Sequence, residues 1–478
     1  MSLNHGINTY KSDTDFAVAA ETPVGIPFFI GAWPCHAGAG YVGKVQLINS
    51  FAEAVTLGGY SSEWRDSTGA PKWTLCEAAY SHFKLFGMKP AVFCNVFNPA
   101  THNTAVAAAT ATVKNHQIKL PVDCIDDSNL VIKTTGNTPA TLVKDTDYEV
   151  YYSGENCIVE LLPASTSYSA TALSVAYNKA NPGAITATDI ENAVEEIEKC
   201  KSILGIVPDL ICAPGWSSTA SVAAVMAAKA SSINGIFKAK AVVDLDTSAS
   251  GADDYSEVLS VKNSNGYNDP NMIVCWPLVK NGDKVFSLST IICGLMAQID
   301  AENGSPFESP SNKTIPITGA CTKSGAEVSI SIPQADVVSY SDGVVTVLNN
   351  DGWRAWGNYT ACWPGEPDVA KNFICTSRMQ DYLCNVFVTM FWGYLDRPLT
   401  PVLIDAITNS YNSWLNGLTA DGQLYGGEIA YVEDNNPTAS LVDGKFRLDT
   451  RAASPVPAQE IDMYVEYDVD MLTAAFAE

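Results

Sequence analysis

The chain has 478 residues, of which 47% are hydrophobic and 17% charged, and its net charge is −24. An acidic chain without Lys- or Arg-rich runs argues against nucleic acid as a partner, because phosphate binding requires clustered basic side chains. No run of about 18 apolar residues predicts a membrane span, and the first residues lack the basic and apolar regions of a signal peptide. We therefore expect about two to four domains, made and kept in the cytosol, without membrane insertion.

The N-terminal residues 1–21 are small and polar and are predicted to form a loose arm. A short extended stretch within it consists of Gly6, Ile7, Asn8, Thr9 and Tyr10. Residues 22–104 begin a core, with a buried strand at 24–31 and a helix at 75–86 that leads into a strand at 91–97.

A glycine-rich loop follows the first strand. Gly38, Gly40 and Gly43 fit the GxGxxG pattern, and with Lys44 they fit most of a phosphate-binding loop. Such a loop needs Ser or Thr after the lysine and a helix that begins there. Here valine follows, the next residues read as a strand, and the helix starts only after Ser50. We interpret the Gly38–Lys44 loop as a surface loop, and a cytosolic nucleotide-dependent enzyme that uses it remains an alternative.

The pattern changes at 105–180 to short alternating runs separated by turn residues, which predicts an inserted all-β domain. The runs are 117–120, 130–133, 148–152, 158–162 and 173–177. Helices and strands alternate again over 181–350, typical of a βαβ core whose strands need both faces covered. Its first helix has a capping-box candidate at Thr188 and Glu191. The other expected elements are strands at 209–213, 239–245 and 271–279 and helices at 219–231 and 287–301.

Catalytic and metal-binding patterns are absent from the sequence. Thirteen cysteines are scattered without a CxxC pair, and several lie in apolar runs typical of reduced, buried thiols. The five histidines show no ligand spacing such as HxxxH, and neither a GxSxG elbow nor HExxH occurs. We therefore predict no catalytic residue, no cofactor and no metal site, and we favour a structural role.

The chain ends in a regular period-two pattern at 460–478. Apolar side chains alternate at Ile461, Met463, Val465, Tyr467, Val469 and Met471. Acidic side chains occupy the other face, and only Tyr464 interrupts the alternation, so the pattern predicts a half-buried strand. Because it follows a Pro- and Ala-rich segment at the terminus, we interpret it as an arm that adds a strand to a neighbouring subunit. An ordinary last strand within its own domain is the alternative.

A C-terminal domain is expected at 351–459, with helices at 376–392 and 401–418. Its first stretch resembles a motif of the sheath proteins of contractile phage tails and phage-tail-like particles. The matching residues are Gly352, Arg354, Trp356, Gly357, Asn358 and Thr360. The next helix, with Arg378, Asp381 and Tyr382, is similar to an Arg-containing helix of that family. The segments 398–418 and 25–31 also resemble family elements.

The resemblance implies an α/β multidomain fold. It has a three-layer βαβ-type core, the inserted all-β domain on the outside, and extended N- and C-terminal arms. It also implies subunits that polymerise helically around an inner tail tube, lend their arms to neighbouring copies, and contract to drive the tube through a target cell envelope. Baseplate and tail terminator proteins are further implied partners. We expect a virion or tail-like particle that is assembled in the bacterial cytoplasm.

One further expectation concerns the contact with the tube, and one alternative function remains. The C-terminal domain resembles the layer next to the tube, and Lys371 and Arg378 are the candidates for tube-facing residues. A non-contractile shell or surface-layer subunit is a further alternative to the sheath.

Overall fold

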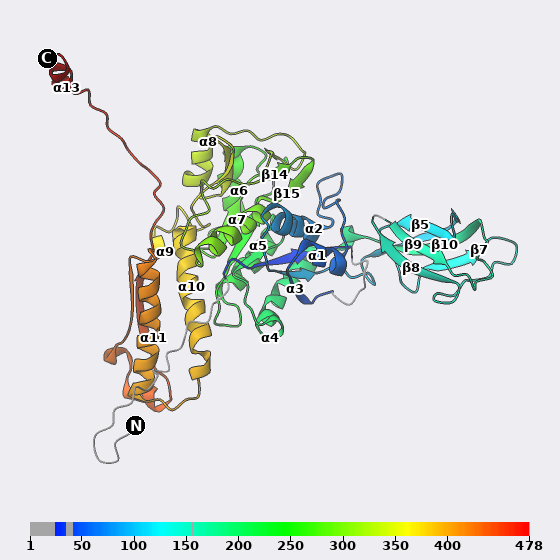
Figure 1. Cartoon of the computed structure of the whole chain (residues 1–478), viewed down its shortest axis with the longest axis horizontal. Helices are drawn as coiled ribbons and strands as arrows, with labels where there is room; N and C mark the ends of the chain where they lie inside the picture. Colours follow the sequence, from blue (N-terminus) through cyan, green and yellow to red (C-terminus); the bar gives the residue numbers. More distant parts are fainter. Residues whose placement is uncertain (1–23, 35–41, 155, 478) are drawn as a thin grey trace, which may run out of the picture.

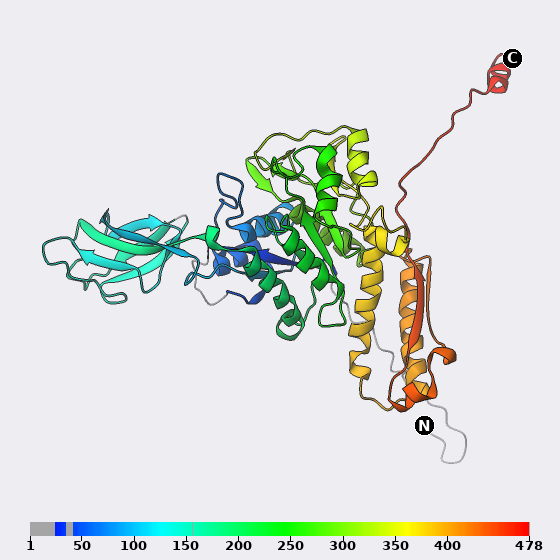
Figure 2. The ribbon, with the colours of Figure 1, turned by 180° about the vertical axis from the view of Figure 1, so that it is seen from behind.

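The computed structural model describes residues 24–34, 42–154 and 156–477. Three parts are visible in Figures 1 and 2: a central α/β body, a strand region projecting to one side, and a helical unit on the other side, from which the C-terminal segment extends. The fold is therefore mixed α/β with several sheets, as expected. The predicted stretch Gly6–Tyr10 lies outside the described residues.

The body is built on a six-stranded sheet. Its order is β13 (Met272–Cys275), β12 (Lys240–Asp244), β11 (Leu210–Cys212), β1 (Pro27–Gly31), β3 (Ala91–Asn95) and β2 (Val45–Ile48). All neighbours are parallel except β2 and β3. Most of these strands are buried along their whole length, because parallel strands with helices packed on them must be apolar on both sides. The strands predicted in this part are confirmed, although several are shorter than expected.

Two groups of helices contact this sheet. In the first, α2 (Thr74–Ala79), its continuation η2 (Tyr80–Leu85) and α7 (Leu288–Asn303) lie together, and α7 contacts β11, β12 and β13. In the second, α3 (Ala187–Val194) packs against α5 (Ala220–Ser231) and both contact the sheet. The remaining helices of the body are α1 (Phe51–Gly58), α4 (Cys200–Leu204), α6 (Val258–Ser264) and α8 (Ile332–Asp336), which continues as η6 (Val337–Ser341).

Two details of the body differ from the sequence predictions. The capping box of α3 consists of Thr186 and Asp189, because the helix already begins at Ala187; the proposed pair Thr188 and Glu191 is wrong. The strand expected at 271–279 is divided into β13 and β14 (Leu278–Asn281). Pro277 lies between them and has no backbone N–H to continue the ladder. Strand β14 instead pairs with β15 (Lys284–Phe286) and β16 (Gly319–Cys321).

The strand region, residues 103–180, has its own hydrophobic cluster. Its elements are β4 (Asn103–Thr112), β5 (Gln117–Pro121), β6 (Cys124–Ile125), β7 (Val131–Thr134), β8 (Tyr148–Ser153), β9 (Asn156–Leu161) and β10 (Ala172–Ala180). One sheet has β10 between β4 and the short strands β6 and β7, and the other has the order β5-β9-β8. Asn103 pairs with Ala180, so the chain leaves and re-enters the body at one place. The five predicted strands are confirmed, whereas β4 and the short β6 were not predicted.

The helical unit consists of α10 (Ile374–Phe391), α11 (Pro401–Ala420) and a hairpin of β19 (Gly426–Tyr431) and β20 (Leu448–Ala453). Short helix α12 (Thr438–Val442) lies in the hairpin connection. The hairpin contacts α11, and the three elements enclose a separate hydrophobic cluster. Both helices predicted here are confirmed. The unit joins the body through β17 (Thr346–Asn349), β18 (Trp353–Trp356) and α9 (Val369–Asn372).

The C-terminal arm, residues 460–477, differs from the predicted strand. Residues 460–468 form no strand, and α13 (Val469–Ala475) is a helix, so the strand prediction is wrong for this part of the unassembled chain. Asp468 caps α13 by accepting hydrogen bonds from the backbone of Asp470 and Met471. All residues of the arm are exposed, and none pairs with a described strand, which excludes the alternative of an ordinary last strand.

Candidate assembly site

The motif resembling sheath proteins forms a tight hairpin with β17. Strand β18 pairs with β17 along its length, and Gly352 and Gly357 flank it with φ values of 107° and 142°. A Cβ at Gly357 would lie 2.9 Å from the Cα of Val345, so a larger residue would push the two chains apart. The two glycines therefore have a structural role.

The other motif residues connect this hairpin to its surroundings. Arg354 donates hydrogen bonds to the backbone oxygens of Asn350 and Asn312 at 3.2 and 3.0 Å. The backbone oxygen of Asn358 accepts from the N–H of Ile374 at 2.8 Å, at the first residue of α10. Thr360 is fully buried, and its hydroxyl donates to the backbone oxygen of Lys371 at 2.8 Å. The motif thus fixes the start of the helical unit against the body.

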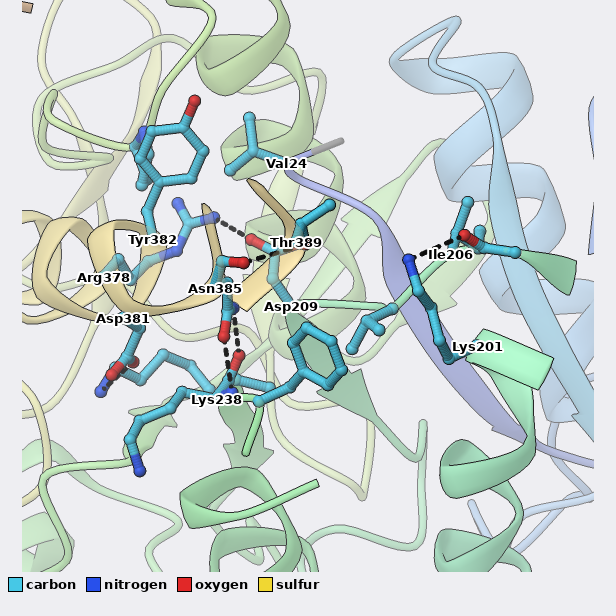
Figure 3. A pocket seen from close by; sticks show the side chains of 16 residues that line it. Val24, Lys201, Ile206, Asp209, Lys238, Arg378, Asp381, Tyr382, Asn385 and Thr389 are labelled. Carbon is cyan, nitrogen blue, oxygen red and sulfur yellow. Dashed lines mark hydrogen bonds and ion pairs between the residues drawn. The ribbon is translucent and has the colours of Figure 1, made fainter. Parts of the chain in front are cut away.

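Arg378 is buried, so its prediction as an exposed tube contact is wrong. It projects from α10 toward Asp209, which directly precedes β11 (Figure 3). Its side chain is 4% exposed. The guanidinium lies 2.8 Å from the Asp209 carboxylate and 2.5 Å from that of Asp300. Burial raises the pKa of Asp300 to about 6, an effect that Arg378 opposes. Arg378 therefore anchors α10 to the body.

Two further side chains on the same face of α10 complete this anchor. Asp381 pairs with the buried Lys240 at 2.8 Å, at the first residue of β12. Asn385 accepts from the backbone N–H of Lys238 at 2.9 Å and donates to its carbonyl at 2.8 Å. A cavity of about 280 Å³ remains beside these contacts, and its charged groups are already paired with one another or with backbone oxygens. This cluster joins two structural units.

Lys371 lies on the surface, as predicted. Its amino group pairs with Glu366 at 3.0 Å and its side chain is 49% exposed. Its contact with the tube stays a prediction.

An apolar groove runs along the helical unit between α10 and β20. It has a volume of about 470 Å³ and is lined by Gln380, Leu383, Cys384, Phe387, Val388, Tyr411, Ile429, Phe446, Leu448, Thr450 and Ala452. The last three are alternate residues of β20, so one face of the hairpin forms its wall. In the described part of the chain, β20 pairs only with β19, and the backbone groups on its other edge are not used by a strand. The groove is suited to an extended segment with alternating apolar side chains.

The carboxyl ends of the parallel strands, where α/β enzymes usually bind ligands, are filled by the chain itself. Asp244 accepts from the hydroxyls of Ser217 and Ser289 at 2.9 and 2.6 Å. Glu77 accepts from the backbone of Ser287 and pairs with Arg65 at 3.2 Å. The space left there is about 20 Å³. Among the described residues, no group of three or more His, Cys, Asp or Glu side chains is placed to hold a metal.

The glycine-rich loop lies partly outside the described residues, which include neither Gly38 nor Gly40. The residues after Lys44 form strand β2, and α1 begins only after Ser50, whose hydroxyl accepts from the backbone of Glu53. The helix that a phosphate-binding loop requires is therefore not at the lysine, as the sequence indicated.

The root of the C-terminal arm lies against the motif. The hydroxyl of Tyr359 donates to the side-chain oxygen of Gln459 at 2.7 Å, across 100 residues of sequence. The motif and the arm have local patterns in the sequence, whereas this contact, the groove and the partners of Arg378 have none. Each depends on residues far apart in the chain that have no common spacing or periodicity.

Known relatives are tail sheath proteins. The chain is 25% identical to the tail sheath protein of Burkholderia phage BcepMu over 408 residues, which cover 81% of this chain and 83% of the relative. It is 26% identical to a putative prophage major tail sheath protein of Pseudomonas aeruginosa over 296 residues, covering 61% of this chain and 73% of the relative. No family model matches the chain.

Solved structures of contractile particles share the fold. A chain of the anti-feeding prophage baseplate matches with a TM-score of 0.60 and 13% identity, over 98% of this chain and 99% of that chain. A chain of an extracellular contractile injection system sheath in the contracted state matches with a TM-score of 0.58 and 12% identity, over 98% and 100%. Among the described residues, no helix combines the length and apolarity needed to cross a bilayer.

Proposed function

We propose that this chain, which belongs to the contractile tail sheath family, polymerises helically around an inner tail tube and contracts to drive that tube through a target cell envelope. Two features of the described residues carry the assembly step: an arm that pairs with no described strand and an open apolar groove. The arm exposes alternating apolar side chains on every copy, and every copy also presents the groove beside β20.

The arm of one copy is expected to enter the groove of the next and to lie along β20 as an added strand. Ile461, Met463 and Val465 are each more than 80% exposed in the unassembled chain. Burying each of them in an apolar groove contributes about 1.5–3 kcal/mol, and each new backbone hydrogen bond adds about 0.5–1.5 kcal/mol. Because the arm and the groove are different surfaces, the contact between copies is heterologous, and such contacts generate an open helical assembly where the rotation between copies does not close into a ring.

Contraction needs no catalytic chemistry in this account. The three-layer core, with helices on both faces of the six-stranded sheet, acts as a rigid body, and the helical unit is bound to it through Arg378 and Asp381. New contacts between such bodies supply the free energy, while the arms keep neighbouring copies linked during the rigid-body movement. The partners are other copies of the chain, the inner tube, the baseplate and the tail terminator, within a virion or tail-like particle that assembles in the bacterial cytoplasm. The helical unit faces the tube, with Lys371 as a candidate contact, and the strand region is the inserted domain on the outside.

Truncation before Glu460 tests the assembly step. The truncated chain should remain folded, because the arm makes no strand contact with the body, and it should no longer form tubes in electron micrographs. Val465→Pro should act similarly, since proline removes a ladder donor, whereas Val465→Thr keeps the donor and the strand preference and should assemble. Normal tubes from the truncated chain would refute the role of the arm. A purified protein whose tubes never occur in a shortened state would instead support a non-contractile shell.

A further inference from the structure

The C-terminal arm begins next to a hydrogen bond between Gln459 and the buried Tyr359. The hydroxyl of Tyr359 donates to the side-chain oxygen of Gln459 at 2.7 Å, and Gln459 directly precedes the fully exposed residues 460–477. Tyr359 itself is only 4% exposed. The hydrogen bond therefore lies at the boundary between the packed chain and the arm.

The Tyr359 ring is held in place by its neighbours. It stacks on Trp363, with a centroid distance of 4.3 Å and an interplanar angle of 11°, and on Phe373, at 5.1 Å and 21°. Trp363 is fixed in turn, because its indole N–H donates to the backbone oxygen of Tyr340 at 2.5 Å. Tyr359 and Phe373 also form a backbone bridge. A hydroxyl on a ring with this little freedom specifies where its acceptor must lie.

The chain on the other side of the hydrogen bond is stiff and extended. Two prolines, Pro455 and Pro457, restrict the backbone just before Gln459. Pro457, Ala458, Gln459 and Ile461 line a groove of about 380 Å³ together with Tyr340 and Trp356 of the body. The segment around the hydrogen bond therefore lies along the body, although Ile461 is still 87% exposed.

We propose that Tyr359 and Gln459 are positioning residues that set the point and the direction in which the arm leaves its subunit. The inference rests on the proposed function of the arm. Residues 460–477 span up to about 60 Å when extended, so a small change of direction at this hydrogen bond moves the far end by many ångströms. The nearest buried residue before the arm is Ser454, so loss of the hydrogen bond would add five residues, 455–459, to the exposed tether. A longer tether lowers the effective concentration of the arm at the neighbouring groove.

Three substitutions test this role in the full-length chain. Tyr359→Phe keeps the ring and its stacking but removes the donor, and Gln459→Leu removes the acceptor while keeping the size. Gln459→Glu keeps an acceptor and is the matched control. Tyr359→Phe and Gln459→Leu should raise the concentration needed for tube formation several-fold, as measured by sedimentation, and should speed amide exchange at 455–461 in the unassembled chain. The double variant should be no worse than either single variant, because both remove the same hydrogen bond.

A merely structural role would lower the thermal unfolding midpoint of Tyr359→Phe and Gln459→Leu. Under the positioning role, the midpoint of the three single variants should equal that of the original chain, because the hydrogen bond lies at the edge of the packed chain. Wild-type exchange at 455–461 and a wild-type assembly concentration in Tyr359→Phe and Gln459→Leu would overturn the positioning role. If truncation before Glu460 still abolishes tube formation in that case, the proposed function of the arm stands and only the positioning role fails. Additive effects of the two substitutions on the assembly concentration of the double variant would also contradict the positioning role.

Discussion

At the scale of single residues, the junction between the body and the helical unit depends on Arg378. Replacing it with alanine would leave Asp300 buried without its partner, and removing one side of a buried ion pair costs about 3–5 kcal/mol. We expect Arg378→Ala to lower the free energy of unfolding by that amount in urea titrations.

Lys371→Ala is the matched control for this substitution. Its ion pair with Glu366 is exposed, and exposed ion pairs contribute little to stability because water and salt screen them. An equal loss of stability in the two variants would show that the junction is not held by the buried charges. Only Lys371 remains suitable for a charge-reversal test of tube binding, because reversal at Arg378 would place a third carboxylate beside Asp209 and Asp300.

A second residue prediction concerns pH. His82 is fully buried in η2, and burial lowers its pKa to about 4 from about 6.5. Between these two values the unfolded chain binds more protons than the folded chain, so acidification from pH 7 to pH 4 favours unfolding. The pKa difference corresponds to about 3 kcal/mol. His82→Gln should remove this part of the pH dependence in unfolding experiments, and parallel stability curves for the two chains would contradict the assignment.

Single residues also show what a sequence can reveal. Gly352, Gly357 and Thr360 stand in a motif whose spacing is local, so they were found, and the structure gives each a backbone or buried role. The partners of Arg378 lie 78 and 169 residues away, and nothing in the sequence couples them. The sequence therefore predicts an exposed charge at Arg378, where the structure has a buried one.

At the scale of secondary structure elements, the groove between α10 and β20 is the main feature without a sequence signal. It contains Cys384, which is exposed, whereas the other described cysteines are buried. A bulky maleimide on Cys384 would fill the space that the arm needs. We expect labelled protein to remain folded but to lose tube formation.

The control for this experiment is Cys384→Ser treated with the same reagent. This variant should assemble as well as untreated protein. Because it keeps Cys35, it also shows whether labelling at that cysteine affects assembly. Tube formation by chains whose Cys384 is fully labelled would show that the groove does not receive the arm.

Elements with strong periodicity were predicted well, and the failures have physical reasons. The long helices α10 and α11 and the buried strands of the sheet have regular apolar patterns. Strand β4 consists mostly of Ala and Thr and lacks alternation, because most of its residues are exposed on both faces. The arm has the alternation of a strand but no partner strand in the single chain, and Asp468 instead starts a short helix.

At the scale of the whole molecule, the strand region is the part most separate from the rest. Its hydrophobic cluster is distinct from that of the body, and its first and last residues pair directly. We expect replacement of residues 105–180 with a short Gly/Ser linker to preserve folding and tube formation, with a loss of outer mass in electron micrographs. Unfolding of the body, seen by circular dichroism, would mean that the boundaries or the role are wrong.

The measurement that tests the central claim most directly is a cryo-electron microscopy reconstruction of tubes assembled from the full-length chain. We predict that residues 460–477 of one copy lie as an extended strand along β20 of another copy, with Ile461, Met463 and Val465 facing the groove beside α10. A reconstruction in which the arm folds back on its own subunit, or in which the groove stays empty in assembled tubes, would contradict the account.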